Sequence, residues 1–304
     1  TVVLSALTGM AMPGSDHLNG QVDLFHSTDH FIPRIKSVPH VAPLMDVIPL
    51  SNPEWMLHRL RKTKNAIWKQ STHWPDHIIT ISEYSKSQLV EYLGLRSDDI
   101  SVSYLGVDHR YYERFNRETI RACLTKHGLG EQFFLFVGTL QPRKNLEKLV
   151  SSHLAVSPEV RRAFPLVIVG REGWGNINWT TLLGRDHIHW LQHVSDIEKR
   201  ALMQTGTAMV FPSLAEGFGL PVIEACASEL PVIASNTTAI PEVAGNAALL
   251  VDPEDVGMLS EAMLALALDE SHRQDMKQKG LARAQTFTWE ACAEAPLKAY
   301  QKVL

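Results

Sequence analysis

Five short, unbroken apolar runs recur through the second half of the chain. They are Phe133–Val137, Leu166–Val169, Ala208–Phe211, Pro231–Ala234 and Ala248–Val251. Runs without polar alternation are typical of strands buried on both faces, as in a parallel sheet. Helical patterns separate these runs, over Asn145–Leu154, Asp196–Gln204, Leu220–Ser228 and Ile240–Ala244. This alternation predicts an α/β fold with a doubly wound sheet.

The first part of the chain has the same character. A strand over His77–Ile81, a helix over Ser82–Leu93 and a strand over Ile100–Tyr104 are predicted. Because 304 residues is about twice a common domain length, we expect two domains. The charged stretch before residue 130 places their boundary, giving domains over 1–125 and 126–287. Two later helices are predicted, one from an Asp252 cap to Leu268 and one over 288–303.

Composition excludes several classes of protein. Hydrophobic residues make up 45% and charged residues 20%, as in a globular protein with a sizeable core. No apolar run approaches the roughly 18 residues that a membrane span needs, and the net charge of −4 argues against general nucleic-acid binding. Three widely spaced cysteines without a CxxC pair argue against a zinc site or a disulfide scaffold. We therefore expect a cytoplasmic protein.

The segment 57–69 is unusually basic. It holds five Lys or Arg between His58 and Lys69 and no acid. One interpretation is a solvated surface helix, with Leu57, Leu60 and Ile67 on its inner face. The other is a docking surface for anionic lipid or a lipid-linked phosphate, which would hold the protein peripherally at the cytoplasmic face of the inner membrane.

Polar residues follow the apolar runs at the edge of the sheet where ligands collect in open α/β folds. Arg143 and Lys144 come after the first run and precede a helix. They are either two exposed charges of little consequence or a clamp on a diphosphate.

Two carboxylates flank the helix start after the third run. Gly217 and Gly219 allow a backbone to approach a ligand there, and helix amides favour anions. Glu216 precedes the helix and Glu224 lies about one turn inside it, so both can accept hydrogen bonds from hydroxyls. The alternative is a capping acid and a surface glutamate. Together with the basic pair, the segment predicts a site for a nucleoside diphosphate that carries a sugar.

These segments resemble retaining glycosyltransferase family 4. The resemblance rests on Gly138–Asn145 (GTLQPRKN), Glu216–Glu224 (EGFGLPVIE, with the Glu-x7-Glu spacing), Pro231–Asn236 with Pro241–Gly245, His77–Lys86 and Leu105–Asp108. It covers the chain from about residue 23 to its end.

The resemblance implies a GT-B fold, with two Rossmann-like domains facing across a cleft and the last helix crossing back to the first domain. It implies a hexosyltransferase that takes its sugar from a nucleotide donor without a metal. The form of the first motif resembles bacterial mannosyltransferases of polysaccharide and lipopolysaccharide assembly, so GDP-mannose is the expected donor and a UDP-hexose the alternative. The expected acceptor is a glycan or a lipid-pyrophosphate-linked sugar.

The resemblance also implies residue roles. Arg143 and Lys144 would neutralise the diphosphate, Glu216 would bind the donor sugar and Glu224 the ribose. The remaining donor-binding positions are Gly138, Gly170, Arg171, Val194 beside His193, Phe218, Gly219 and Leu220. Asp46 would act in catalysis, and His26 and His30 would line the acceptor side.

Two departures from the family pattern matter. Met45 precedes Asp46 where the family has histidine, which implies altered donor handling or a weakened enzyme. The first domain is also shortened and lacks the glycine-rich loop after an opening strand. Either segments are missing from this chain or the domain is reduced.

Other functions stay open. A non-catalytic relative acting as a complex partner agrees with Met45, but the four donor residues Arg143, Lys144, Glu216 and Glu224 oppose it. A phosphorylase would need a free phosphate site and an epimerase would need base residues in the first domain, and neither is recognisable.

Overall fold

The computed structural model describes residues 2–29, 32–55, 61–175 and 177–304. The chain divides into two compact units, the first over 1–106 with 289–304 and the second over 107–288. The boundary expected at 125/126 therefore lies at 106/107. Residues 107–125 belong to the second unit because α5 (Arg117–His127) packs against α9 (Asp196–Thr205).

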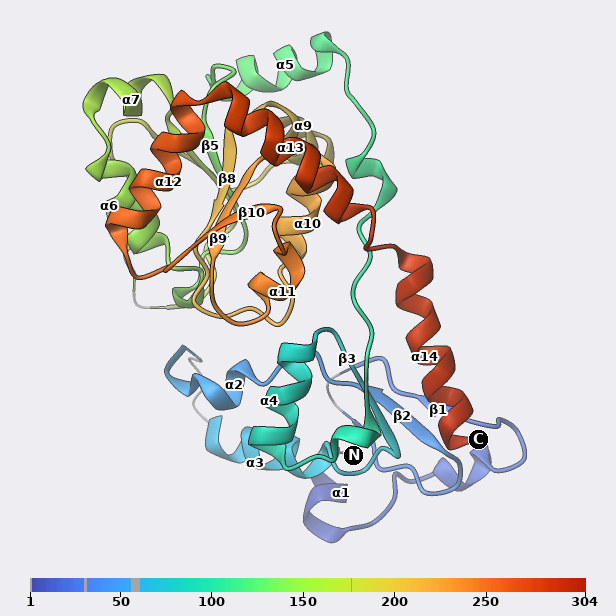
Figure 1. Ribbon diagram of the computed structural model, residues 1–304. Helices are drawn as coiled ribbons and strands as arrows, with labels where there is room; N and C mark the ends of the chain where they lie inside the picture. The colour runs from blue at the N-terminus through green and yellow to red at the C-terminus, as the bar shows by residue number, and fades with distance from the viewer. Residues whose placement is uncertain (1, 30–31, 56–60, 176) are drawn as a thin grey trace. The chain divides into compact units, whose positions relative to one another are not determined.

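The second unit is built on a parallel six-stranded sheet in the order β10-β9-β8-β5-β6-β7. The strands are β5 (Phe134–Val137), β6 (Leu166–Val169), β7 (Ile188–Leu191), β8 (Ala208–Phe211), β9 (Val232–Ser235) and β10 (Ala248–Val251). Figure 1 shows α6 (Leu146–Ala155) and α12 (Val256–Leu268) on one face, with α9 and α10 (Leu220–Ala227) on the other. The chain leaves β5 in one direction and returns to pair β8 on its other side, so the order reverses between these two strands. The predicted doubly wound sheet is confirmed.

Several elements of this unit depart from the prediction. The sequence pattern missed β7 and the helices α5, α7 (Pro158–Ala163), α8 (Trp179–Leu183) and α13 (Glu270–Ala284). The remaining short elements are η4 (His109–Tyr111), η5 (Pro142–Lys144) and α11 (Ile240–Ala244), of which α11 has the predicted bounds. The expected Asp252 cap is wrong, because Asp255 caps α12 by accepting from Met258 N while Asp252 closes a turn at Glu254 N.

The first unit has a parallel four-stranded sheet in the order β1-β2-β3-β4. Its strands are β1 (Phe25–His26), β2 (His40–Pro43), β3 (His77–Thr80) and β4 (Ile100–Val102). Its helices are α1 (Val2–Thr8), α2 (Ile48–Ser51), α3 (Arg61–Ser71), α4 (Glu83–Leu93) and α14 (Trp289–Val303), with short turns η1 (Ser15–Leu18), η2 (Pro53–Trp55) and η3 (Ser97–Asp99).

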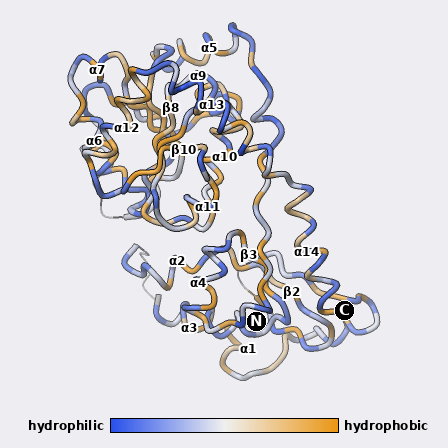
Figure 2. Tube along the Cα trace, viewed as in Figure 1, coloured by the Kyte–Doolittle hydropathy of each residue, from blue (hydrophilic) through white to orange (hydrophobic). Residues whose placement is uncertain are grey.

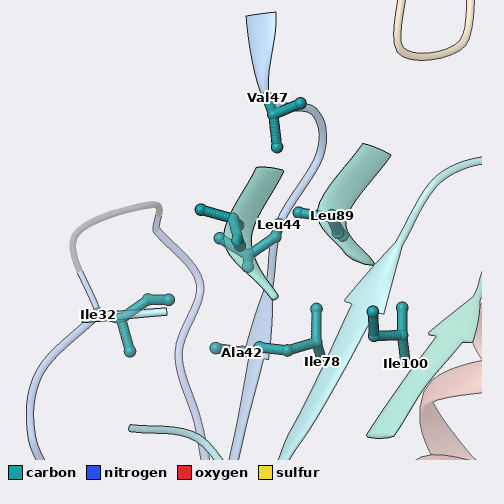
Figure 3. Close-up of a cluster of buried hydrophobic side chains, with 8 residues drawn as sticks. Ile32, Ala42, Leu44, Val47, Ile78, Leu89 and Ile100 are labelled. Carbon is teal, nitrogen blue, oxygen red and sulfur yellow. The ribbon is translucent and has the colours of Figure 1, made fainter. Parts of the chain in front are cut away.

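The sheet of the first unit is covered on both faces. On one side, the buried side chains of Ala42, Ile78 and Ile100 meet Leu89 of α4 (Figure 3). On the other side α14 packs against β2, β3 and β4 and buries Ala299. The C-terminal helix thus completes the core of the unit that contains the N-terminal part of the chain.

Hydropathy follows this layering. In Figure 2 the strands at the centre of the second unit are orange, whereas α5 and α13 on its outside are largely blue. Within the described ranges, none of the helices combines the length and apolar character that crossing a membrane demands.

Candidate functional site

The strongest candidate site lies where the strand order of the second unit reverses. The loop after β5 carries Arg143 and Lys144, and the loop after β8 carries Glu216. Because β5 and β8 are adjacent and parallel, their carboxyl ends bring the two loops together. This is the position at which open α/β sheets bind ligands.

The loops after β5 and β6 are joined so closely that one position requires glycine. A Cβ on Gly170 would lie 1.9 Å from the carbonyl oxygen of Gly138. Leu140 N donates to Arg171 O and Gly173 N donates to Leu140 O, each at 2.9 Å, which extends the pairing beyond the strands. The loop with the two cations is therefore fixed from the β6 side.

Arg143, Lys144 and Glu216 form one hydrogen-bonded cluster. Arg143 Nη1 donates to Glu216 Oε2 at 2.7 Å, and Lys144 Nζ donates to Glu216 Oε1 at 2.5 Å. The Lys144 and Glu216 side chains are only 8% and 9% exposed, while Arg143 is 23% exposed. Each oxygen of one buried carboxylate thus contacts its own cation, and a net positive charge remains.

Burial and charge compete at this cluster. Burial is the largest influence on Glu216 and opposes its ionisation, but the attraction of Lys144 and Arg143 holds its pKa below the ordinary value. Burial lowers the pKa of Lys144, and Glu216 opposes that change. We conclude that Glu216 is ionised, because two cations and their hydrogen bonds stabilise its charge.

Two residues that the sequence reasoning missed support the cluster. Asn145 adopts a left-handed backbone at φ 58° and donates from Nδ2 to the carbonyls of Pro212 and Pro253, at 3.2 and 2.7 Å. Thr238 accepts from Glu216 N at 3.1 Å. An asparagine just before a helix was an available signal for Asn145, because asparagine tolerates the left-handed region.

The start of α10 has the geometry expected for an anion site. Gly219 caps the helix at φ 99°, where a Cβ would lie 2.5 Å from Ile240 Cδ1. Among the described residues, the backbone N–H groups of Gly219 and Leu220 have no hydrogen-bond acceptor. Phe218 is buried against Phe287, so its side chain belongs to the core.

Glu224 is not joined to the cluster by any contact within the described chain. Its Oε2 lies 3.6 Å from Lys199 Nζ, and its carboxylate interacts with the Tyr111 hydroxyl. The Glu-x7-Glu spacing thus places Glu216 in the loop before α10 and Glu224 inside the helix, and the two carboxylates have separate cationic partners. Neither Lys199 nor Tyr111 was singled out from the sequence.

The predicted donor-binding residues Arg171 and Val194, with His193, lie after the ends of β6 and β7. Arg171 Nη2 is 3.2 Å from His193 Nδ1, and both residues are exposed. Val194 is half-buried beside them. These three residues therefore line the same edge as the cluster.

The predicted catalytic residue Asp46 and the predicted acceptor-side residue His26 belong to the first unit. Asp46, the predicted catalytic residue, lies just before α2 and accepts from Ile48 N at 3.0 Å, and Met45 beside it is 49% exposed rather than buried in the core. His26 Nδ1 lies 2.5 Å from the Tyr300 hydroxyl of α14, and burial lowers its pKa. His30 lies outside the described residues.

Comparison with known proteins agrees with this geometry. The sequence profile of the family described as Glycosyl transferases group 1 matches residues 118–283, and that of Glycosyltransferase Family 4 matches residues 16–111. O-antigen chain mannosyltransferase B of Escherichia coli is 31% identical over 285 residues, which cover 91% of this chain and 74% of that protein. Serotype-specific mannosyltransferase WbdA of Escherichia coli is 27% identical over 85% of this chain, which spans only 33% of that relative.

Solved structures share the fold at low sequence identity. Sucrose-phosphate synthase from Thermosynechococcus elongatus superposes with a TM-score of 0.75 at 17% identity, covering 94% of this chain and 75% of that one. Anabaena Alr3699/HepE in complex with UDP gives a TM-score of 0.71 at 18% identity, covering 95% and 79%. With two parallel sheets in two Rossmann-like units, the chain is a GT-B enzyme of the glycosyl transferases group 1 family and transfers sugar.

Proposed function

We propose that the chain is a retaining mannosyltransferase that uses GDP-mannose and extends a glycan or lipid-linked acceptor in O-antigen lipopolysaccharide biosynthesis. The observation that carries the proposal is the cluster of Arg143, Lys144 and Glu216 between β5 and β8. It offers two cations to a diphosphate and a carboxylate to sugar hydroxyls, which are the two parts of such a donor. The names of the Escherichia coli relatives support mannose as the sugar.

Donor binding would exchange partners within the cluster. In the structure Glu216 accepts from both cations. Diphosphate oxygens would compete for Arg143 and Lys144, together with the N–H groups at the start of α10. Glu216 would then accept hydrogen bonds from the sugar, while Glu224 would accept them from the ribose.

Transfer would follow from charge stabilisation at the diphosphate. The bond between the anomeric carbon and the phosphate oxygen breaks, and its electron pair leaves with the diphosphate. An acceptor hydroxyl attacks from the same face, and its proton passes to the departing phosphate oxygen. Arg143 and Lys144 stabilise the charge that develops there, so we propose that no metal is needed and that transfer persists in EDTA. Asp46 is a further proposed catalytic residue, and His26 is the proposed acceptor-side residue within the described chain.

The donor base is the first point to test, and UDP is the alternative to GDP. We would measure thermal unfolding with GDP, UDP, ADP and dTDP, each at about 100 times its dissociation constant, which adds roughly 2.7 kcal/mol of stability. Stabilisation by GDP supports the mannose donor, whereas stabilisation by UDP alone overturns it. No stabilisation by any nucleotide favours a non-catalytic partner, a reading that agrees with the exposed Met45.

We also propose that the first unit binds an anionic membrane surface. The described part of the basic segment forms α3, where Lys62, Lys64 and Lys69 are exposed. The neighbouring α1 packs against α3 and exposes Val3, Leu4 and Leu7. Apolar side chains beside exposed lysines are typical of helices that lie in a lipid interface.

Vesicle sedimentation tests this surface. The protein should bind phosphatidylglycerol vesicles and not phosphatidylcholine vesicles, and the double variant Lys62→Glu/Lys69→Glu should bind at least about tenfold more weakly, at about 1 kcal/mol per charge. Lys279→Glu/Lys298→Glu, at two exposed lysines outside α1 and α3, is the control of equal charge change. Equal binding by both double variants would exclude the α3 surface.

A further inference from the structure

Glu224 has neighbours of its own, which take no part in the cluster around Glu216. Lys199 Nζ lies 3.6 Å from Glu224 Oε2 and 5.0 Å from the centre of the Tyr111 ring. The Tyr111 hydroxyl faces the same carboxylate: burial is the main cause of its raised pKa, and the charge and hydrogen bond of Glu224 raise it further. Three elements, η4, α9 and α10, thus converge on one carboxylate.

The position of Tyr111 is fixed independently of Glu224. Tyr111 is only 4% exposed and ends η4, which Asp108 begins by accepting from Arg110 N at 2.9 Å. The Arg110 side chain binds Asp108 and also reaches Asp196 on α9 at 3.3 Å. Arg200 of α9 donates to Arg110 O at 2.9 Å. The turn that carries Tyr111 is therefore held to the helix that carries Lys199.

The hydrogen-bonding capacity of the carboxylate leaves room for two further donors. An ionised carboxylate accepts about four hydrogen bonds. Tyr111 accounts for one of them, whereas Lys199 Nζ, at 3.6 Å from Oε2, forms an ion pair beyond hydrogen-bond distance. At least two therefore remain, and they match the two hydroxyls of a vicinal diol. Glu224 is 19% exposed, so its remaining oxygen lone pairs can reach a ligand.

We propose that Tyr111 and Lys199 are positioning residues that hold the Glu224 carboxylate ready for the ribose diol of the donor nucleotide. Their role rests on the proposed function, in which Glu224 binds ribose. A carboxylate with one fixed orientation discriminates between ribose and 2′-deoxyribose, because the 2′-hydroxyl donates to a carboxylate oxygen that is already in position. A carboxylate free to rotate loses much of this discrimination.

Calorimetric titration of GDP and 2′-deoxy-GDP, with UDP and 2′-deoxy-UDP in parallel, tests the proposal. The wild-type protein should bind the ribonucleotide at least about tenfold more tightly, as expected for one hydrogen bond to a charged group. Tyr111→Phe and Lys199→Met should each reduce this ratio to roughly threefold or less, with little change in affinity for the 2′-deoxy nucleotide. Glu224→Gln should bring the ratio close to one, and adding Tyr111→Phe to it should change nothing further.

Matched controls separate positioning from general damage. Tyr112→Phe removes a neighbouring phenol hydroxyl whose raised pKa comes from burial and Cys226 rather than from Glu224, so the ratio should stay at the wild-type value. Lys199→Arg should restore most of the discrimination. Equal weakening of both nucleotides, or an unchanged ratio in Tyr111→Phe, overturns the inference and leaves donor binding intact. If the wild-type protein binds neither GDP nor UDP, the proposed function fails as well.

Discussion

The Glu216 carboxylate contacts both cations of the site, and its substitution should separate nucleotide binding from transfer. In Glu216→Gln the shape of the side chain is kept but its charge is lost. Arg143 and Lys144 would then be released to the diphosphate, so GDP should bind as tightly as before or more tightly. Transfer should fall at least about a hundredfold, the usual cost of losing one aligned stabilising group.

Transfer of a radiolabelled sugar measures the rate, and titration with GDP measures the affinity, so the two assays together check both results. Glu254→Gln, at an exposed glutamate of the same unit, is the control and should retain wild-type transfer. Wild-type transfer in Glu216→Gln would remove Glu216 from the sugar site.

Because of His40, the free energy of unfolding of the first unit should depend on pH. The residue is fully buried on β2, and burial lowers its pKa to about 4, with Asp76 opposing and His26 adding to the shift. Below about pH 6.5 the unfolded chain takes up a proton that the folded chain does not bind. The free energy of unfolding should therefore fall by roughly 3 kcal/mol between pH 7 and 4. Burial lowers the pKa of His26 and His77 too, with the same sign.

Hydrogen exchange of the β2 and β3 amides, measured across this pH range, reports the loss of unfolding free energy. His40→Gln should flatten the pH dependence, whereas His109→Gln, at a highly exposed histidine, should not. An equally steep dependence in His40→Gln would assign the titration to other groups.

The loops after β5 and β6 act as one rigid part, which makes Gly170 a sensitive position. In Gly170→Ala the new methyl group must displace Gly138 O, and the shift passes along the loop to Arg143 and Lys144. Overpacking of this kind costs about 1–3 kcal/mol. Thermal unfolding and GDP titration should both show a loss. Gly130→Ala, where a Cβ meets nothing within 4 Å, should change neither, and equal behaviour of the two variants would argue against a rigid loop.

Most of the strands that the sequence predicted are buried on both faces, although the partly buried edge strands β4 and β10 were predicted too. β5, β6, β8 and β9 are buried at every position, and their unbroken apolar runs marked them. β7 is a half-buried edge strand in which His189 interrupts the pattern, so no apolar run was visible. α13 buries only Met276, Gly280 and Ala284 among fifteen mostly polar residues, which is too weak a stripe to read from one sequence.

The site could be predicted only where its residues lie next to strand ends. Arg143, Lys144 and Glu216 follow apolar runs, and adjacent strands bring them together. Tyr111 and Lys199 reach Glu224 through the packing of η4, α9 and α10, which no local pattern records. The same limit explains the domain boundary, because α5 joins the second unit through its contact with α9 rather than through its own sequence.

On the scale of the whole chain, the proposed functional residues fall into two groups, one in each unit. The proposed donor-binding residues all lie in the second unit, whereas the catalytic candidate Asp46 and the acceptor-side candidate His26 lie in the first. The final helix returns to the first unit and packs its Ala299 against Val41 and Ile79. Donor affinity should therefore depend on groups of the second unit, above all on the two cations after β5.

The most direct test is calorimetric titration of GDP into the wild-type protein and into Arg143→Ala/Lys144→Ala. Two charge-assisted hydrogen bonds are each worth about 1.5–3 kcal/mol, so the double variant should bind GDP at least about a hundredfold more weakly. Arg121→Ala/Lys126→Ala, on the exposed face of α5, removes the same charge away from the site and should bind normally. Wild-type affinity for GDP in a folded Arg143→Ala/Lys144→Ala protein would contradict the assignment of this cluster as the diphosphate site.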